Sequence, residues 1–238
     1  MGSFLNVVIL RLEKGEGGIL TGRSKCPKCG KVLNWYELIP LLSFIFLGAK
    51  CRKCHKSISI QYPLVELLTA FLFALLFWKF GLSWRLFFLY PLFSILLILL
   101  VSDLRTMLIP DIVACIGIGL SLIFLLSTNY KLLPNFLLAV VILGGFFALL
   151  VLVSREKWMG RGDILIGVLI GLILGYPNVL VALFLSFILG AAVGATLLLF
   201  KLKKFQSQVP FGPFLIFATF VTIFWGEKII NWYLGIIN

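Results

Sequence analysis

Acidic residues are scarce in this chain of 238 residues, which contains nine aspartates and glutamates and a single histidine. Charged residues of both signs make up 13% of the sequence and hydrophobic residues make up 61%. An ordinary soluble domain has about 25% charged and about 45–50% apolar residues. The composition therefore excludes an ordinary soluble enzyme, a disordered chain and a disulfide-stapled secreted module. The class that remains is an all-α polytopic membrane protein.

Seven apolar runs predict membrane-spanning helices, because about 20 apolar residues cross a bilayer as a helix. The fifth run is short and carries Gly167, Gly171 and Gly175 at a spacing of four, which fits either close helix packing in lipid or ordinary glycine usage. The opening stretch Gly2–Leu10 is too short for a cleavable signal peptide and meets Arg11 at once. The seven runs are Tyr62–Phe80, Trp84–Val101, Leu108–Ser127, Leu133–Ser154, Asp163–Tyr176, Asn178–Phe200 and Pro210–Trp225.

Residues 11–60 have a different composition, with ten basic residues against Glu13, Glu16 and Glu37. This composition predicts a polar domain outside the lipid. Its one apolar stretch, Leu38–Ala49, is too short to span and predicts a core or interfacial helix.

The positions of the basic residues predict the orientation in the membrane. If residues 11–60 lie in the cytoplasm and the chain changes sides at each span, all but four of the 21 lysines and arginines lie in cytoplasmic loops. The net charge of +12 then indicates topology and contact with anionic lipid. No basic–aromatic stripe or binding motif indicates a nucleic-acid partner. The four exceptions are Lys79, Arg85, Lys131 and Lys228.

Four of the five cysteines form two CxxC pairs, Cys26 with Cys29 and Cys51 with Cys54, separated by 21 residues. Two such pairs can supply four thiolates to a structural zinc ion with no open coordination position. Disulfide or redox chemistry is the alternative, which a reducing cytoplasm disfavours. His55 can replace one ligand or stand unused beside the site. Cys115 lies inside the third span and is expected to be a small core residue.

Four of the nine acids lie within or at the edge of the predicted spans: Glu66, Asp103, Asp111 and Asp163. Carboxylates at such depths are costly and indicate function. Two of them brought together from separate helices would share a proton, so that one activates a water and the other donates to a substrate carbonyl. Helix capping is the alternative for Asp111 and Asp163, but it does not suit Asp103 at the C-terminal end of its span.

Two other classes compete with a peptidase. A secondary transporter also uses intramembrane acids, but it would place them near the midplane, often within repeated halves, and the sequence has no internal repeat. A non-catalytic assembly factor would use a zinc domain to dock its partners.

Several segments closely resemble bacterial prepilin peptidases, also called type IV leader peptidases. Three carry acids or prolines of the membrane region: Asp103-LRTMLIP-Asp111, Gly160-Arg-Gly-Asp163 and Val209-Pro-Phe-Gly-Pro-Phe-Leu215. Others are GSFLNVVILRL at residues 2–12, the CPKCG knuckle, WYELIPLLSF at 35–44 and ISIQYPLVE at 58–66. The resemblance covers nearly the whole chain in the family's order.

The resemblance implies a membrane aspartic endopeptidase of the GxGD type that removes the basic leader of type IV prepilins and pseudopilins. Cleavage would follow a glycine on the cytoplasmic side of the bacterial inner membrane. The matching catalytic pair is Asp103 and Asp163. Asp111, Gly160, Gly162 and Glu66 match supporting positions. Members with the tetracysteine domain commonly also methylate the new N-terminus from S-adenosylmethionine.

Two positions depart from the family pattern. An apolar helix usually precedes GSFLN, so residues 1–10 are interpreted as a remnant of a first membrane helix, followed by the tetracysteine domain at 11–60 and the peptidase domain at 61–238. The family often has lysine two residues after the GxGD aspartate, where this chain has Leu165. Because the leader is basic, we expect some of the cytoplasmic-side acids to receive it: Glu13, Glu16, Glu37 and Glu66.

Overall fold

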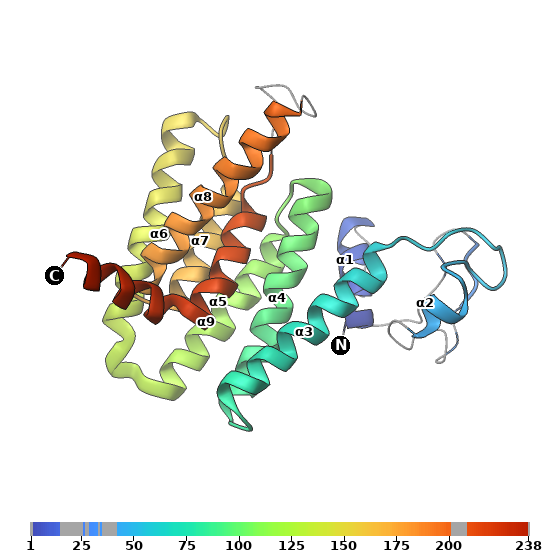
Figure 1. Cartoon of the computed structure of the whole chain (residues 1–238), viewed down its shortest axis with the longest axis horizontal. Helices are drawn as coiled ribbons and strands as arrows, with labels where there is room; N and C mark the ends of the chain where they lie inside the picture. Colours follow the sequence, from blue (N-terminus) through green and yellow to red (C-terminus); the bar gives the residue numbers. More distant parts are fainter. Residues whose placement is uncertain are drawn as a thin grey trace. The chain divides into compact units, whose positions relative to one another are not determined.

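A computed structural model describes residues 2–14, 26, 29–32, 34, 42–200 and 209–237 (Figure 1). These residues form helices and turns, with an isolated β-bridge between Lys50 and Ser57. The chain divides into two compact units, Met1–Ile98 and Leu99–Asn238. The helices are α1 (Gly2–Lys14), α2 (Leu42–Phe46), α3 (Gln61–Phe80), α4 (Arg85–Thr106), α5 (Asp111–Asn129), the 3-10 helix η2 (Tyr130–Leu132), α6 (Leu133–Ser154), α7 (Arg161–Leu174), α8 (Asn178–Leu199) and α9 (Gly212–Ile237).

Six of these helices are long and apolar enough to cross a membrane: α3, α4, α5, α6, α8 and α9. They coincide with six of the seven predicted spans. The remaining predicted span, Asp163–Tyr176, forms α7, which has 14 residues and is therefore about 21 Å long, against a hydrocarbon core of about 30 Å. The expected all-helical, multi-pass membrane architecture is confirmed, with α7 shorter than the other spans.

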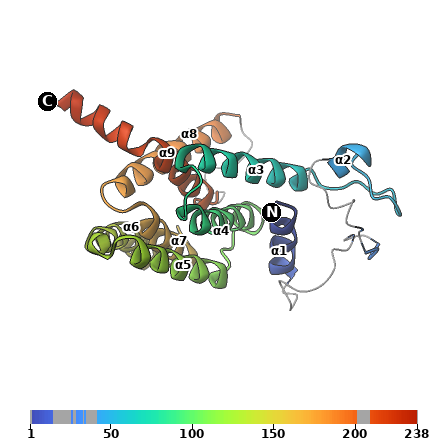
Figure 2. The ribbon, with the colours of Figure 1, turned by 90° about the horizontal axis from the view of Figure 1, so that it is seen from below.

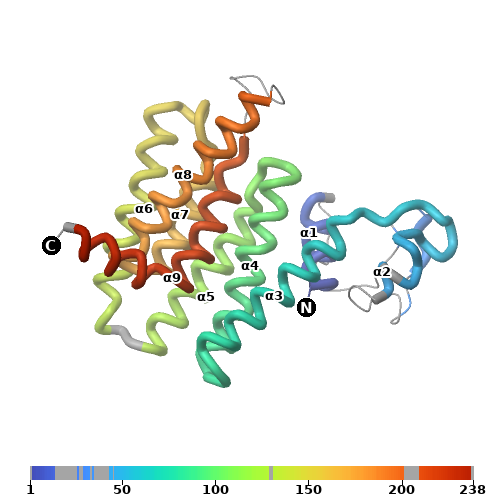
Figure 3. The backbone as a smooth tube through the Cα atoms, in the orientation of Figure 1, coloured from blue at the N-terminus to red at the C-terminus, as the bar shows by residue number. Residues whose placement is uncertain are grey.

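The short helix α7 is enclosed by protein. It contacts α5, α6, α8 and α9, and Figures 2 and 3 show it beside α5 and α6. Its middle is buried, with Ile166, Leu169 and Ile170 fully covered. A helix surrounded by other helices does not need to match the thickness of the lipid, which is why a short α7 is tolerated.

Glycines allow α6 and α7 to approach each other closely. A Cβ atom on Gly171 would lie 2.8 Å from the backbone of Val140, and one on Gly167 would lie 2.8 Å from the ring of Phe147 and 3.3 Å from the carbonyl oxygen of Leu143. Of the two explanations for this glycine spacing, close helix packing is therefore confirmed at Gly167 and Gly171.

In the first unit, α1 packs against α3. The contact is tight because a Cβ on Gly2 would lie 2.7 Å from the Cα of Glu66. The buried Asn6 side chain donates a hydrogen bond from Nδ2 to the carbonyl oxygen of Tyr62, at 3.2 Å. The predicted helix within Leu38–Ala49 corresponds to α2, whereas Glu16, Glu37 and the lysines at 201–204 lie outside the described residues.

Candidate active site

Asp103 lies in the last turn of α4 and is buried, with 4% of its surface exposed. The helix ends one turn later because Met107 adopts a left-handed conformation at φ 54°. The amide of Met107 donates to the carbonyl oxygen of Asp103 at 2.9 Å. Thr106 reinforces this end, since its Oγ1 donates to the carbonyl oxygen of Ser102 at 2.9 Å and accepts from the amide of Leu108 at 3.3 Å.

Asp163 lies in the first turn of α7 and is also buried, with 8% exposed. The helix begins after Gly160, which is extended (φ −83°, ψ 162°), and the amide of Gly160 donates to Oδ2 of Asp163 at 3.2 Å. Asp163 therefore caps its own helix, as the capping alternative predicts. Capping alone does not explain the position of Asp163, because its carboxylate is also buried beside a second acid.

The structure brings Asp103 and Asp163 close enough to interact electrostatically. Asp103 belongs to α4 and Asp163 to α7, and the two residues are 60 positions apart in the sequence. The buried Oδ2 of Asp103 makes no standard hydrogen bond within the described part of the chain. Such an atom is available to a proton shared with its neighbour or to a water.

The start of α9 completes the surroundings of Asp103. The backbone amide of Gly212 faces the carboxylate of Asp103, and a Cβ on Gly212 would lie 2.5 Å from Oδ2 of Asp103 and 3.3 Å from Cδ1 of Ile166. Ile166 is one turn along α7 from Asp163. Gly212 therefore touches both helices that carry the acids, and the absence of a side chain is required for that contact.

The turn that follows Asp103 packs on the GxGD segment. A Cβ on Gly162 would lie 2.6 Å from the Cβ of Ile109, which belongs to the loop between α4 and α5. Asp111, the first residue of α5, is exposed and does not join the buried pair. On the other side of the GxGD segment, Arg161 forms an exposed ion pair with Glu156 at 2.6 Å.

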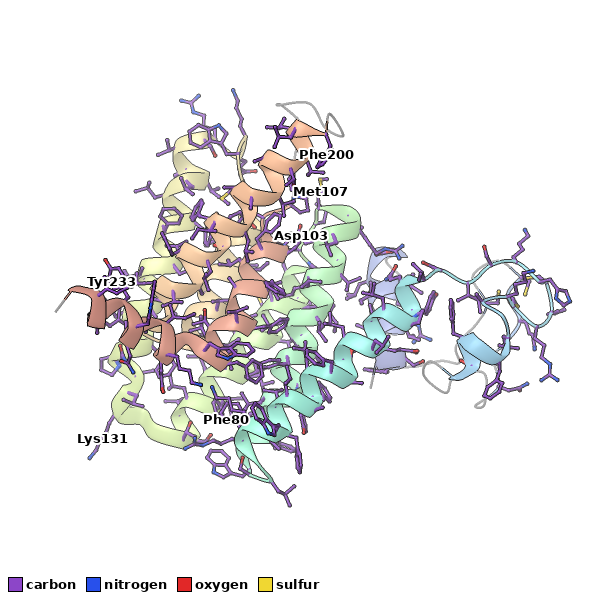
Figure 4. The ribbon with its side chains drawn as sticks, in the orientation of Figure 1. Phe80, Asp103, Met107, Lys131, Phe200 and Tyr233 are labelled. Atoms are coloured by element: carbon purple, nitrogen blue, oxygen red, sulfur yellow. The ribbon has the colours of Figure 1, made fainter. Side chains whose placement is uncertain are left out.

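The site lies toward one end of the second unit. Figure 4 shows Asp103 and Met107 toward the end at which α8 finishes near Phe200, and Lys131 at the opposite end. The turn between α6 and α7 lies at the same end as the turn between α4 and α5 (Figure 1). The C-terminal ends of α4, α6 and α8 therefore lie toward the same end of this unit.

Sequence reasoning assigned no role to Gly212, Ile109 or Thr106. A signal for Gly212 was present, because glycine before proline in the Phe211–Phe214 segment indicates a backbone that must turn and approach another group closely. The role of Ile109 arises from its tertiary contact with Gly162, which no local signal identifies. Thr106 acts locally, through its hydrogen bonds with Ser102 and Leu108. Glu66 lies half-buried on α3 in the other unit, where its backbone contacts Gly2.

The four predicted cysteine ligands form one cluster, with their sulfur atoms all within 4.8 Å of one another. Tetrahedral zinc with bonds of about 2.3 Å places its sulfur ligands about 3.8 Å apart, so the cluster fits this ion. Cys26 and Cys51 are buried, as the first ligand of each pair. These cysteines are free thiols, not disulfides, in the structure. Cys115 is exposed on α5, so the expectation that it is a core residue was wrong.

The two cysteine pairs have the same backbone geometry. Cys26 donates from its amide to Lys31 at 2.8 Å, and Cys51 donates to Lys56 at 3.0 Å. The residue after the second cysteine is left-handed in both turns, Gly30 at φ 69° and His55 at φ 53°. His55 is thus a turn residue outside the four-sulfur cluster. Backbone amides of Cys54 and Lys53 lower the pKa of the Cys51 thiol to about 6, which favours the thiolate that a metal binds.

Together, the fold and the site define a multi-pass helical membrane protein with a buried carboxylate pair and a four-cysteine cluster. The model of the bacterial peptidase A24 N-terminal domain matches residues 1–80, and the model of the type IV leader peptidase family matches residues 90–195. The chain belongs to the type IV leader peptidase family.

Proteins of known name extend the same similarity. A prepilin leader peptidase/N-methyltransferase of Legionella pneumophila is 32% identical over 99% of this chain and 91% of its own length. Proteins of the same name from Bacillus subtilis and Pseudomonas aeruginosa are 34% and 31% identical, over 91% and 98% of this chain and 87% and 90% of their own lengths. No solved structure matches the chain significantly.

Proposed function

We propose that this protein is an aspartic endopeptidase that removes the basic leader of type IV prepilins or pseudopilins. The observation that carries the proposal is the burial of Asp103 and Asp163 side by side, from two separate helices. Family membership and the names of the relatives support the substrate class. Cleavage after a glycine is part of the proposal through the family resemblance.

Asp103 and Asp163 would divide the work of peptide hydrolysis. The ionised carboxylate takes a proton from a water, which attacks the scissile carbonyl carbon, and the protonated carboxyl donates to the carbonyl oxygen. In the resulting tetrahedral intermediate, the carboxyl that gained the water proton donates it to the departing amine nitrogen as the C–N bond breaks. The other carboxylate takes a proton from a hydroxyl of the intermediate, so the pair again holds one shared proton. The amide of Gly160 holds the carboxylate of Asp163, and the amide of Gly212 faces the carboxylate of Asp103. Gly162, which packs against Ile109, and Asp111, which begins α5, would support the loop between α4 and α5.

The four cysteines would hold a zinc ion with a structural role. Cys26, Cys29, Cys51 and Cys54 supply all four positions of a tetrahedral site, so the ion would fix the fold of its region and take no part in hydrolysis. The cluster supports our proposal of residues 11–60 as a tetracysteine domain. We propose residues 61–238 as the peptidase domain.

The relatives' names also support N-methylation of the new N-terminus. S-adenosylmethionine would supply the methyl group as an electrophile to the free amine. We assign no residue to its binding. The half-buried Glu66, together with the acids near the N-terminus, remains our candidate for receiving the leader.

The proposed location is the bacterial inner membrane, with the carboxylate pair toward the cytoplasm. The described cytoplasmic-side basic residues and the position of Lys131 at the far end from Asp103 support this orientation.

One incubation tests both activities together. The purified protein is mixed with a prepilin and S-adenosylmethionine, and the product is measured by mass spectrometry. We expect loss of the leader after a glycine and a gain of one methyl group on the mature pilin. Cleavage without methyl gain would contradict only the proposed methyltransferase activity, whereas an intact prepilin would contradict the proposed peptidase activity.

A further inference from the structure

The turn that carries the second cysteine pair exposes a dense cluster of positive charge. The basic hairpin, as we call residues 50–57, presents four exposed basic side chains: Lys50, Arg52, Lys53 and Lys56. Residues 42–60 contain no aspartate or glutamate. The four-cysteine cluster uses the sulfur atoms of Cys51 and Cys54 in this hairpin and none of its basic groups.

Backbone pairing fixes this cluster in place. The amide of Cys51 donates to the carbonyl oxygen of Lys56 at 3.0 Å, and the amide of Ile58 donates to the carbonyl oxygen of Ala49 at 2.7 Å. Lys50 is bridged to Ser57. These bonds hold Lys50 and Lys56 at the base of one turn, with Arg52 and Lys53 at its tip.

Large apolar side chains stand exposed on both sides of the basic hairpin. Phe46, at the end of α2, is 84% exposed, and Ile60, just before α3, is 74% exposed. Exposed apolar groups cost free energy in water. Basic residues combined with exposed aromatic and aliphatic residues are typical of segments that lie in a membrane interface.

The bilayer surface is within reach of the hairpin by covalent connection. The membrane-spanning helix α3 begins at Gln61, five residues after Lys56, and five extended residues cover about 17 Å at most. Figures 1 and 2 show α2 and the hairpin beyond the N-terminal end of α3. A basic prepilin leader has the wrong sign of charge to be the partner of this surface.

We propose that the basic hairpin, with Phe46 and Ile60, docks on the anionic phospholipid headgroups of the leaflet from which α3 enters the membrane. The lysines contact the headgroup phosphates, and the two apolar side chains enter the boundary with the acyl chains. Anionic lipid then holds the four-cysteine cluster at the membrane surface.

Hydrogen exchange of the full chain in nanodiscs tests this proposal. One set of discs contains neutral phosphatidylcholine alone, and the other also contains phosphatidylglycerol. We expect the amides of residues 46–60 to exchange at least about tenfold more slowly in the anionic discs, because each lysine near such a surface contributes roughly fivefold to the docking equilibrium. High salt should remove the difference, since it screens these charges. Amides of α6 report whether lipid composition changes the whole protein.

Two triple variants with equal loss of charge separate docking from general electrostatics. The variant Lys50→Gln, Lys53→Gln, Lys56→Gln keeps all four cysteines, and we expect it to abolish the difference between the discs at unchanged metal content. The control variant Lys79→Gln, Lys131→Gln, Lys228→Gln should retain the difference. The proposal is overturned by equal exchange in both discs, by equal effects of the two variants, or by soluble polyglutamate giving the same protection in neutral discs.

Discussion

Replacement of Gly212 by alanine should disturb the geometry of the carboxylate pair in a protein that still folds. The new Cβ would stand 2.5 Å from Oδ2 of Asp103. Both backbones are helical at this contact and cannot bend locally. Either the carboxylate of Asp103 rotates away from the new methyl group, or α4 and α9 move apart, by roughly 0.5–1 Å. A misplacement of about 1 Å in a catalytic group costs about 100-fold in rate. We therefore expect kcat for leader cleavage to fall about 100-fold in Gly212→Ala.

The assay is cleavage of a purified prepilin in detergent, followed over time at several substrate concentrations. KM should change little, since Gly212 contacts Asp103 and Ile166 within the protein. Gly145→Ala is the matched control, because nothing lies within 4 Å of a Cβ at that position of α6. Unchanged kcat in Gly212→Ala, or equal losses in both variants, would refute the assigned contact between α9 and Asp103.

Three further predictions concern packing and the cysteine cluster. Gly171→Ala should lower the free energy of unfolding by about 1–3 kcal/mol, measured by thermal or denaturant unfolding, because its Cβ meets the backbone of Val140 at 2.8 Å; Gly119→Ala, which has open space, should not lower it. Cys26→Ser and Cys51→Ser should each lose bound zinc in elemental analysis, whereas Cys115→Ser should keep it, since Cys115 lies outside the cluster. His55→Gly should retain zinc and unfold at a slightly higher temperature, because glycine relieves the left-handed backbone at φ 53°; loss of zinc in this variant would instead make His55 a ligand.

The membrane helices were predictable from the sequence because each is a long apolar run bounded by charge or proline. The sequence prediction placed the third and fourth runs at Leu108–Ser127 and Leu133–Ser154, and the structure has helices Asp111–Asn129 and Leu133–Ser154. Helix α7 was harder to interpret, because hydropathy does not distinguish a helix surrounded by protein from one surrounded by lipid. Its burial depends on Gly167 and Gly171 fitting against α6, which is a tertiary property.

The candidate site was predictable from the sequence where it uses rare acidic side chains. It was not predictable where it depends on a backbone contact. Asp103 and Asp163 stood out because acids are scarce and costly in a membrane. Gly212 contributes a backbone amide and the absence of a side chain, and its glycine–proline sequence indicates a close approach of the backbone without identifying Asp103 as the neighbour. For His55 the sequence left two possibilities, a substitute ligand or an unused neighbour of the site. In the structure it is a turn residue, the counterpart of Gly30, outside the four-sulfur cluster.

The central claim is that Asp103 and Asp163 form one catalytic pair. Its most direct test is leader cleavage by purified Asp103→Asn and Asp163→Asn, with Glu227→Gln as a control that removes an exposed carboxylate from α9. The account predicts that each aspartate variant inserts and folds but leaves the prepilin intact in mass spectrometry, whereas the control cleaves normally. Retained cleavage in either well-folded aspartate variant would contradict the account.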